Sequence, residues 1–323
     1  MSTASVETVA ETVGRVRAAV ASRVVGQDAV IDEALVAFLA RGHALLEGVP
    51  GTAKTLLVRA LGGALGARFG RIQFTPDLMP SDITGVSVLR QQGGGGQFEF
   101  HPGPVFTDLL LADEINRAPA KTQAALLEAM AERQVTVEGR PRALGDLFTV
   151  FATQNPVEYE GTYPLPEAQL DRFLLKIRVP YPALEAELEM LARYAAGFDA
   201  ERPADVATAP VVSAEELALL RTVADGVTVT PEVRAYVAAV VRATREDAGL
   251  TLGGSPRATV ALFRAARAAA VLAGRAFATP DDVKELAPAV LRHRVMVAPE
   301  LEVEGRTADD VLQAVLSRVP APQ

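Results

Sequence analysis

The sequence predicts an α/β fold, in which a parallel sheet with helices on both faces is followed by a small all-helical domain. Five short segments of the first half are apolar almost continuously, as strands buried on both faces are, and helical patterns lie between them. Beyond Pro182 the strands stop and capped helices follow one another. The segments predicted as strands are Ala44–Glu47, Arg71–Phe74, Leu109–Ala112, Phe148–Thr153 and Phe173–Val179.

The composition limits the chemistry that this chain can perform. With 323 residues, of which 49% are hydrophobic and 22% charged, the chain is long enough for about two domains with a substantial core. It contains no cysteine, which excludes disulfides, zinc–thiolate sites and a catalytic thiol. His43, His101 and His293 lack metal-ligand spacing, and we expect them to be surface or packed residues. The chemistry must come from carboxylates, hydroxyls, lysine, arginine or a bound cofactor.

The charge balance and the N-terminus bear on location and partners. A formal net charge of −8 argues against a bulk electrostatic grip on nucleic acid or on an anionic membrane. Glu7 and Glu11 interrupt the regions that a signal peptide would need, and no apolar run reaches the roughly 18 residues of a spanning helix. We therefore expect a cytoplasmic protein without membrane insertion.

The chain divides into three parts. Apolar residues recur at helical spacing from about Val6 to Val20, which predicts an N-terminal helix within residues 1–22. The sheet domain is expected at 23–182 and the helical domain at 183–323, with Arg202–Pro210 as an irregular connection. Helix starts in the last part carry cap signals, namely Ser213 with Glu216, Thr230-Pro231 and Thr279-Pro280.

One segment of the sheet domain is of low complexity. Gly93–Gly96 lies between Val86–Leu89 and Gln97–Phe100, both of which read as strands. We expect a β-hairpin insert at about residues 86–100, with the glycines at its tip.

A phosphate-binding loop is predicted directly after the first strand. Gly48-Val-Pro-Gly-Thr-Ala-Lys54-Thr55 opens the predicted helix Leu56–Leu65, so that backbone N–H groups and a helix N-terminus converge on phosphates. Lys54 would reach the terminal phosphates and Thr55 would ligate Mg²⁺. The strict pattern has glycine at position 53, and Ala53 is tolerated if this position does not need a positive φ. Taken alone, the motif could also be a glycine-rich turn with an incidental Lys-Thr.

Two further motifs end at the same edge of the predicted sheet. Asp113 and Glu114 close an apolar strand, where a Mg²⁺-orienting acid and a water-activating base are expected. By itself, such an acidic pair is more often a helix cap or a solvated turn. Asn155 closes the next strand and could hold the lytic water or sense the γ-phosphate, although an isolated Asn-Pro more simply turns the chain.

The order of these motifs, followed by Leu170-Asp171-Arg172-Phe173 and Ser255-Pro256-Arg257, resembles an AAA+ ATPase. Longer stretches are similar to the MoxR family within that class, and the resemblance runs from about Val24 to Arg294. These stretches are Gln73–Gly85, Gly103–Met130, Thr153–Pro156 and Glu160–Phe173. The resemblance implies an AAA+ P-loop domain followed by a helical lid.

The resemblance also implies roles for single residues. Lys54 and Thr55 take the Walker A role, Asp113 and Glu114 the Walker B role and Asn155 that of sensor 1, with Thr55 and Asp113 holding Mg²⁺. Ala at position 53 is a known variant in the family. The segment Val24–Gln27 is similar to one that packs on adenine. The implied nucleotide-binding positions are Val25, Gly26, Gly48, Pro50, Gly51, Thr52, Ala53, Lys54, Thr55 and Asp113.

Arginines complete the implied site. Arg172 matches an arginine finger that projects into the neighbouring subunit's nucleotide, and Arg257 matches sensor 2, acting within its own subunit or across an interface. An exposed arginine is otherwise more often part of a surface salt bridge, which contributes little. Arg117 is a second interface candidate, and Leu165–Leu170 is expected to be core or interface packing. A finger acting in trans implies a ring.

The implied function is hydrolysis of ATP to ADP and phosphate by a ring, expected to be hexameric, that remodels or matures protein complexes as a chaperone does. A partner with a von Willebrand factor A domain and a client complex follow from the resemblance alone, as does an approach of the Gly93–Gly96 hairpin to the pore or substrate. The alternatives are a nucleotide-dependent assembly module with little turnover, a chelatase subunit and a nucleic-acid motor. The net charge of −8 disfavours the motor.

Overall fold

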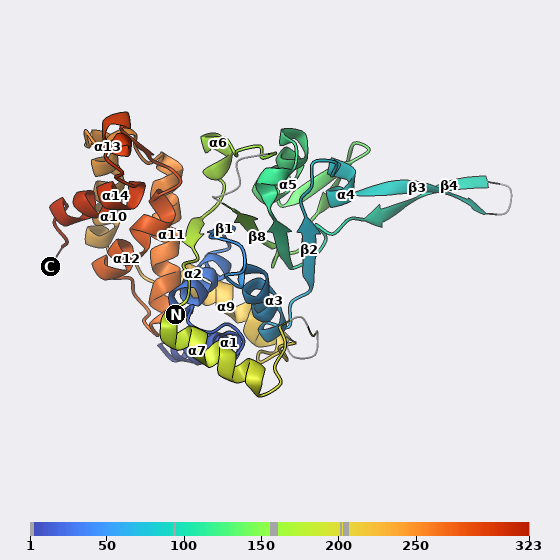
Figure 1. Cartoon of the computed structure of the whole chain (residues 1–323), viewed down its shortest axis with the longest axis horizontal. Coiled ribbons are helices and arrows are strands. Elements are labelled where there is room, and N and C mark those ends of the chain that lie inside the picture. Colours follow the sequence, from blue (N-terminus) through green and yellow to red (C-terminus); the bar gives the residue numbers. More distant parts are fainter. Residues whose placement is uncertain (1–2, 93–94, 156–160, 201, 203–206, 323) are drawn as a thin grey trace.

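The computed structural model describes residues 3–92, 95–155, 161–200, 202 and 207–322. Its centre is a sheet of five parallel strands in the order β2-β5-β8-β1-β9 (Figure 1). Every strand end lies within two residues of the predicted one, which confirms the parallel sheet. The strands are β1 (Ala44–Glu47), β2 (Phe69–Gln73), β5 (Leu109–Asp113), β8 (Thr149–Gln154) and β9 (Leu175–Arg178).

Helices cover both faces of this sheet, as the continuous apolar strands predict. Leu111 is buried in a cluster shared with α2 (Asp28–Leu39) and α3 (Lys54–Ala64). Its neighbour Leu110 is buried in a second cluster, shared with α5 (Ala120–Glu132). Successive strand residues thus enter different cores, because side chains alternate across a strand.

The N-terminal helix belongs to the first of these cores. Helix α1 (Thr3–Ala21) matches the predicted helix, and its buried face includes Val9, Val13 and Val16. It packs against α2, α3, α9 (Ala214–Gly226) and α11 (Pro256–Leu272). No helix in the described part of the chain is long and apolar enough to cross a membrane.

The last part of the chain forms the predicted helical lid, and its caps are confirmed. The side chains of Ser213, Thr230 and Thr279 accept hydrogen bonds from the backbone N–H three residues on. Each satisfies one of the open donors at a helix start. The remaining helices of this part are α10 (Pro231–Glu246), α11 (Pro256–Leu272), α12 (Pro280–Leu291), α13 (Pro299–Val303) and α14 (Ala308–Arg318).

The lid differs from the prediction in one detail. It is not all-helical, because β10 (Leu250–Leu252) and β11 (Met296–Val297) pair antiparallel. Strands of two or three residues are too short to leave a periodic pattern in the sequence. In the predicted connection Arg202–Pro210, positions 203–206 lie outside the described residues, and the rest carries neither helix nor strand. The domain boundaries at 22 and 182 stay predictions.

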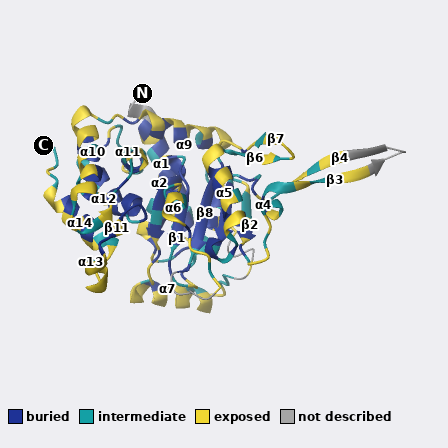
Figure 2. Ribbon diagram, turned by 90° about the horizontal axis from the view of Figure 1, so that it is seen from above, coloured by how far each residue is buried: buried dark blue, intermediate teal, exposed yellow. Residues whose placement is uncertain are grey.

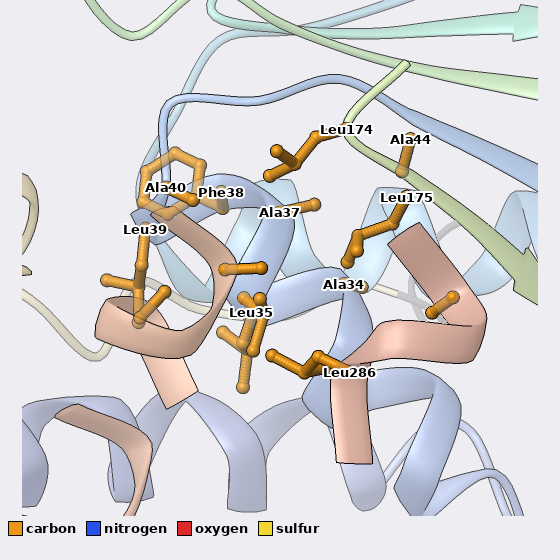
Figure 3. Close-up of a cluster of buried hydrophobic side chains, with 14 of the residues drawn as sticks. Ala34, Leu35, Ala37, Phe38, Leu39, Ala40, Ala44, Leu174, Leu175 and Leu286 are labelled. Atoms are coloured by element: carbon orange, nitrogen blue, oxygen red, sulfur yellow. The ribbon is translucent and has the colours of Figure 1, made fainter. Parts of the chain in front are cut away.

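The lid packs directly on the sheet domain. Figure 3 shows Leu286 of α12 beside Leu35 of α2 and Leu175 at the start of β9. These side chains are fully or almost fully buried. An apolar contact of this kind couples the position of the lid to that of the neighbouring strand.

Two hairpins extend the sheet domain. The predicted insert is confirmed as β3 (Gly85–Gln92) paired with β4 (Gly95–Pro102), which project far from the body (Figure 1) with many exposed residues (Figure 2). Of its glycine tip, 93–94 lie outside the described residues. A second hairpin, β6 (Gln134–Val137) with β7 (Arg140–Ala143), was not predicted. The remaining short elements are α4 (Pro80–Thr84), η1 (Ile115–Arg117), α6 (Glu167–Leu170) and α7 (Leu184–Ala195).

Two sharp turns from strand to helix contain strained residues. Ala53, the residue before α3, has φ 61° and ψ 21°, and Glu114, after β5, has φ 56° and ψ 51°. Position 53 therefore has a positive φ, so the condition under which alanine would replace glycine there without strain is not met. A residue with a Cβ atom pays about 1–2 kcal/mol in this left-handed conformation, and such strain persists where the surroundings hold it in place.

Replacing Ala53 by glycine should stabilise the protein. Ala53→Gly removes the strain but gives the unfolded chain more freedom, so we expect a net gain of about 0.5–1 kcal/mol in the free energy of unfolding, measured with denaturant. The control is Ala235→Gly on the exposed face of α10, which should lose about 0.5–1 kcal/mol because the helix interior disfavours glycine. Equal losses at both positions would contradict the strain.

Candidate functional site

The loop between β1 and α3 folds around the amine of its own lysine. Lys54 Nζ donates to Gly48 O at 2.8 Å and to Val49 O at 2.7 Å, and lies 3.3 Å from Thr52 Oγ1. Burial lowers the pKa of Lys54, while Asp113 and Glu114 oppose this shift. The amine is thus a half-buried cation held at the start of a helix, where backbone N–H groups are open. This arrangement suits a bound phosphate.

Asp113, at the end of β5, faces a hydroxyl and a cation. Its Oδ1 accepts a hydrogen bond from Thr153 at 2.6 Å, and Thr55 Oγ1 lies 3.5 Å from Oδ2. The guanidinium of Arg71 forms an ion pair with Oδ2 at 2.7 Å. A carboxylate beside a threonine hydroxyl is the oxygen donor set that holds Mg²⁺ together with substrate phosphates, so Thr55 and Asp113 fit the predicted ion.

Glu114 follows Asp113 and reaches into the same region. Its left-handed backbone turns the chain, and its N–H donates to Thr153 Oγ1 at 2.8 Å. The half-exposed carboxylate accepts from Gln73 Nε2 at 2.8 Å and lies 3.2 Å from Arg117 Nε. Arg117 thus pairs with Glu114 of its own chain, and a carboxylate held in this way is positioned to take a proton from water.

A cavity of about 490 Å³ brings most of the predicted site residues together. It opens at the edge of the sheet where β1, β5 and β8 end, and the buried Asn155 lies at its wall. This volume is typical of a small-molecule site. The predicted residues that line it are Val25, Pro50, Gly51, Thr52, Ala53, Lys54, Thr55, Asp113, Glu114 and Asn155.

Gly26 and Gly48 are not among the residues that line this cavity, and both act through close packing. A Cβ on Gly26, where φ is 70°, would lie 2.4 Å from the Cβ of Ala186 in α7. A Cβ on Gly48 would lie 2.5 Å from Val179 O. The glycines thus let the loops that bound the cavity approach α7 and the end of β9.

The sequence did not predict the wall that α7 and the residues after it contribute. Met190, Arg193, Tyr194 and Phe198 line the cavity, and the rings of Tyr194 and Phe198 meet edge to face with centroids 5.6 Å apart. Met190, Tyr194 and Phe198, together with Val24 and Val25, give this cavity an apolar part that suits a flat ring system. The only signal was an aromatic pair four residues apart, with Tyr194 in the last turn of α7 and Phe198 just after that helix.

The two remaining predicted arginines lie elsewhere. Arg172 and Arg257 are exposed and line a second cavity of about 730 Å³, together with Gly42 and His43. These last two residues precede β1, whereas the phosphate loop follows it, and a four-residue strand spans about 13 Å. The cavities therefore open at opposite edges of the sheet, and both arginines are remote from the phosphate loop of their own chain.

The histidines take the packed or surface positions expected of them. His43 is buried, and burial together with Arg133 lowers its pKa to about 3, so that its neutral ring accepts from the N–H of Val150. His293 is also buried, while His101 is exposed. Within the described ranges, no cluster of three or more histidines and carboxylates could hold a metal ion.

Comparison with protein families agrees with this geometry. Residues 43–175 match the family described as "ATPase family associated with various cellular activities (AAA)". Residues 242–315 match the AAA lid domain. The two matches cover most of the sheet domain and about half of the helical part that follows it.

Similar proteins span nearly the whole chain. The chain is 47% identical to the Bacillus subtilis protein YeaC over 92% of its own length and 91% of the relative's. It is 44% identical to Chaperone MoxR1 of Mycobacterium tuberculosis, over 93% and 80% of the two chains. A crystal structure of a candidate ATPase from Cytophaga hutchinsonii superposes with a TM-score of 0.89 at 39% identity, covering 99% and 97%. This chain belongs to the MoxR family of AAA+ ATPases.

Proposed function

We propose that this chain hydrolyses ATP to ADP and phosphate in sites that two neighbouring subunits of a ring complete together. The observation that supports this most is the separation of the two cavities. The phosphate loop, Asp113 and Glu114 lie at one edge of the sheet, and Arg172 and Arg257 lie at the other. One subunit thus presents the arginine edge while its neighbour presents the phosphate edge, in a head-to-tail contact that can close into a ring.

Within one subunit, each group of the first cavity has a distinct task. The backbone of the phosphate loop and Lys54 bind the β- and γ-phosphates, while Tyr194 and Phe198 receive the base. Thr55 and Asp113 hold Mg²⁺, which neutralises charge on the phosphate oxygens when bound. Glu114 accepts a proton as water attacks the γ-phosphorus, the bond to the β–γ bridging oxygen breaks, and ADP leaves.

Three residues around Glu114 and Asp113 hold these carboxylates. Gln73 and Arg117 hold Glu114, and Arg71 pairs with Asp113. Mg²⁺ bound together with ATP would compete with the guanidinium of Arg71 for the carboxylate of Asp113, because both cations are attracted to the same negative charge. Asn155, at the end of β8, is placed to orient the water or to contact the γ-phosphate.

The neighbouring subunit adds positive charge to that of Lys54 near the γ-phosphate. Arg172 and Arg257 form no ion pair with any residue that the structure describes, so both guanidiniums are available to an anion. An arginine delivered in trans stabilises the charge that builds up on the transferred phosphoryl group, by a factor of order 10³ or more in other systems. For Arg257, which the sequence left open, we propose the same direction of action.

The cellular role follows from the family and from the projecting hairpin. We propose a hexameric ring that remodels or matures a protein complex, with a partner that carries a von Willebrand factor A domain. Leu89 and Phe98 are paired across the hairpin and both are exposed, which gives one of its faces an apolar patch for a client protein. The cytoplasmic location stays a prediction of the sequence.

Substitution of Glu114 tests the catalytic base. Glu114→Gln keeps the shape of the side chain but cannot accept the proton, so we expect turnover at saturating ATP to fall by about 10²-fold or more with nucleotide binding retained. Steady-state phosphate release and binding of a fluorescent ATP analogue measure the two effects. The control is Glu128→Gln on the exposed face of α5, which should turn over like the parent. Turnover of Glu114→Gln at the parent rate would reject this residue as the base and favour another.

Mixed rings test the contribution of the neighbour. Lys54→Ala disables the phosphate edge and Arg172→Ala disables the arginine edge, so each variant alone should be nearly inactive. In a random one-to-one mixture about one interface in four joins two intact edges, and we expect about a quarter of the wild-type ATP turnover to return. If the two proteins assemble together but no mixing ratio restores turnover, Arg172 does not act in trans.

A further inference from the structure

Arg172 is exposed, yet the short segment that carries it is firmly held. This segment, residues 171–174, connects α6 to β9 at the arginine edge of the sheet. Its backbone carbonyls accept hydrogen bonds from two adjacent lid residues, His293 and Arg294. These residues follow α12, so the lid holds the segment from a distance of more than a hundred residues along the chain.

Arg294 makes the full set of hydrogen bonds that a guanidinium can donate. Its Nε donates to Asp171 Oδ1 at 2.7 Å. Nη1 donates to Leu174 O at 3.0 Å and to Val290 O at 2.5 Å, and Nη2 donates to Asp171 O at 3.0 Å and Phe173 O at 2.5 Å. The five N–H groups thus meet five acceptors, and the Arg294 side chain is only 3% exposed.

The electrostatics make Asp171 the essential partner of this arginine. Burial lowers the pKa of Arg294, and the hydrogen bond and charge of Asp171 oppose that shift. Asp171 is the carboxylate that pairs with Arg294, at 2.7 Å. A buried guanidinium without its carboxylate is strongly disfavoured, so the contact between the two fixes the position of the segment.

Asp171 also reaches the segment that carries the other arginine. Ser255 Oγ lies 3.3 Å from Asp171 Oδ2, a long hydrogen bond, and accepts from the N–H of Ala258 as the cap of α11. Arg257 stands two residues after Ser255 in the first turn of that helix. One carboxylate therefore touches both the lid residue that grips the segment of Arg172 and the helix start that bears Arg257.

We propose that Asp171 and Arg294 are positioning residues that fix Arg172, before β9, and Arg257, on the lid, as one unit at the arginine edge of their own subunit, for use in the neighbour's site. This rests on the proposed function above. Neither residue touches the nucleotide in this arrangement; both act through the arginines. A movement of the lid displaces the segment of Arg172, because α12 and Arg294 hold that segment, and so changes hydrolysis in the adjacent subunit.

The first test compares two aspartates of similar structural role. Asp171→Asn keeps the shape but removes the charge that holds Arg294, so kcat for ATP should fall about tenfold or more while KM changes by less than about threefold, since a misplaced finger acts on the transition state. Asp309→Asn is the matched control. Asp309 also ties the lid to β9, pairing with Arg178 at 2.7 Å and Arg292 at 3.0 Å, but makes no contact with residues 171–174. It should keep the parent kcat.

Mixed rings then show at which edge Asp171 acts. Asp171→Asn mixed with Lys54→Ala should regain about a quarter of the wild-type turnover, because its phosphate edge is intact. Mixed with Arg172→Ala it should regain nothing beyond the sum of the separate variants, because both proteins are defective at the arginine edge. If Asp171→Asn instead damaged the fold as a whole, and not the arginine edge alone, both mixtures would give the same result.

Several outcomes would overturn the positioning role. These are an unchanged kcat of Asp171→Asn, an equal loss in Asp309→Asn, recovery in the mixture with Arg172→Ala, or failure of Asp171→Asn to form rings, which would assign the pair to assembly. The mixture of Lys54→Ala with Arg172→Ala distinguishes a failure of the proposed trans site from a failure of the positioning role. If it regains no activity, the proposed trans site is wrong; if it does and the mixture of Asp171→Asn with Lys54→Ala does not, only the role of Asp171 and Arg294 is wrong.

Discussion

The common direction of the five strands is the constraint on which the rest of this structure depends. In a parallel sheet all strand ends that carry turns into helices lie at one edge, and all strand starts lie at the other. The phosphate loop, Glu114 and Asn155 follow strands, while Arg172 precedes one. Since chain order alone assigns these groups to opposite edges, no lid movement within a subunit brings Arg172 across the sheet, and a second copy is the natural way to join them.

The phosphate edge contains backbone strain that the buried strands hold in place. Ala53 and Glu114 both adopt left-handed backbone at turns where their side chains or N–H groups face the cavity. Such strain is tolerated because Leu45, Leu46 and Leu110 to Ala112 anchor the strands before these turns with fully buried side chains. At Glu114 the strained turn places the carboxylate at the wall of the cavity.

Most of the fold could be predicted from the sequence, because strands, caps and the phosphate loop depend on residues close together in the chain. Ser213 with Glu216 and the segment Leu109–Ala112 are recognisable without any tertiary contact. The aromatic wall behind α7 and the positive φ at Ala53 could not be predicted in this way. Both arise from how distant segments pack, as does the grip of Arg294 on residues 171–174, which no local pattern indicates.

The distribution of arginine explains how an acidic protein can assemble phosphate-directed surfaces. The net charge of −8 is spread over the whole chain, whereas the second cavity gathers Arg41, Arg133, Arg172, Arg257, Arg264 and Arg294 against only Glu132 and Asp171. Burial and neighbouring arginines lower the pKa of Arg133. Such a concentration of like charge is unfavourable in the isolated subunit, and an anionic surface from a neighbour relieves it. In the ring that we propose, the phosphates of a nucleotide bound by the neighbouring subunit would provide that anionic surface, and assembly of the ring would then depend on occupancy of the nucleotide sites.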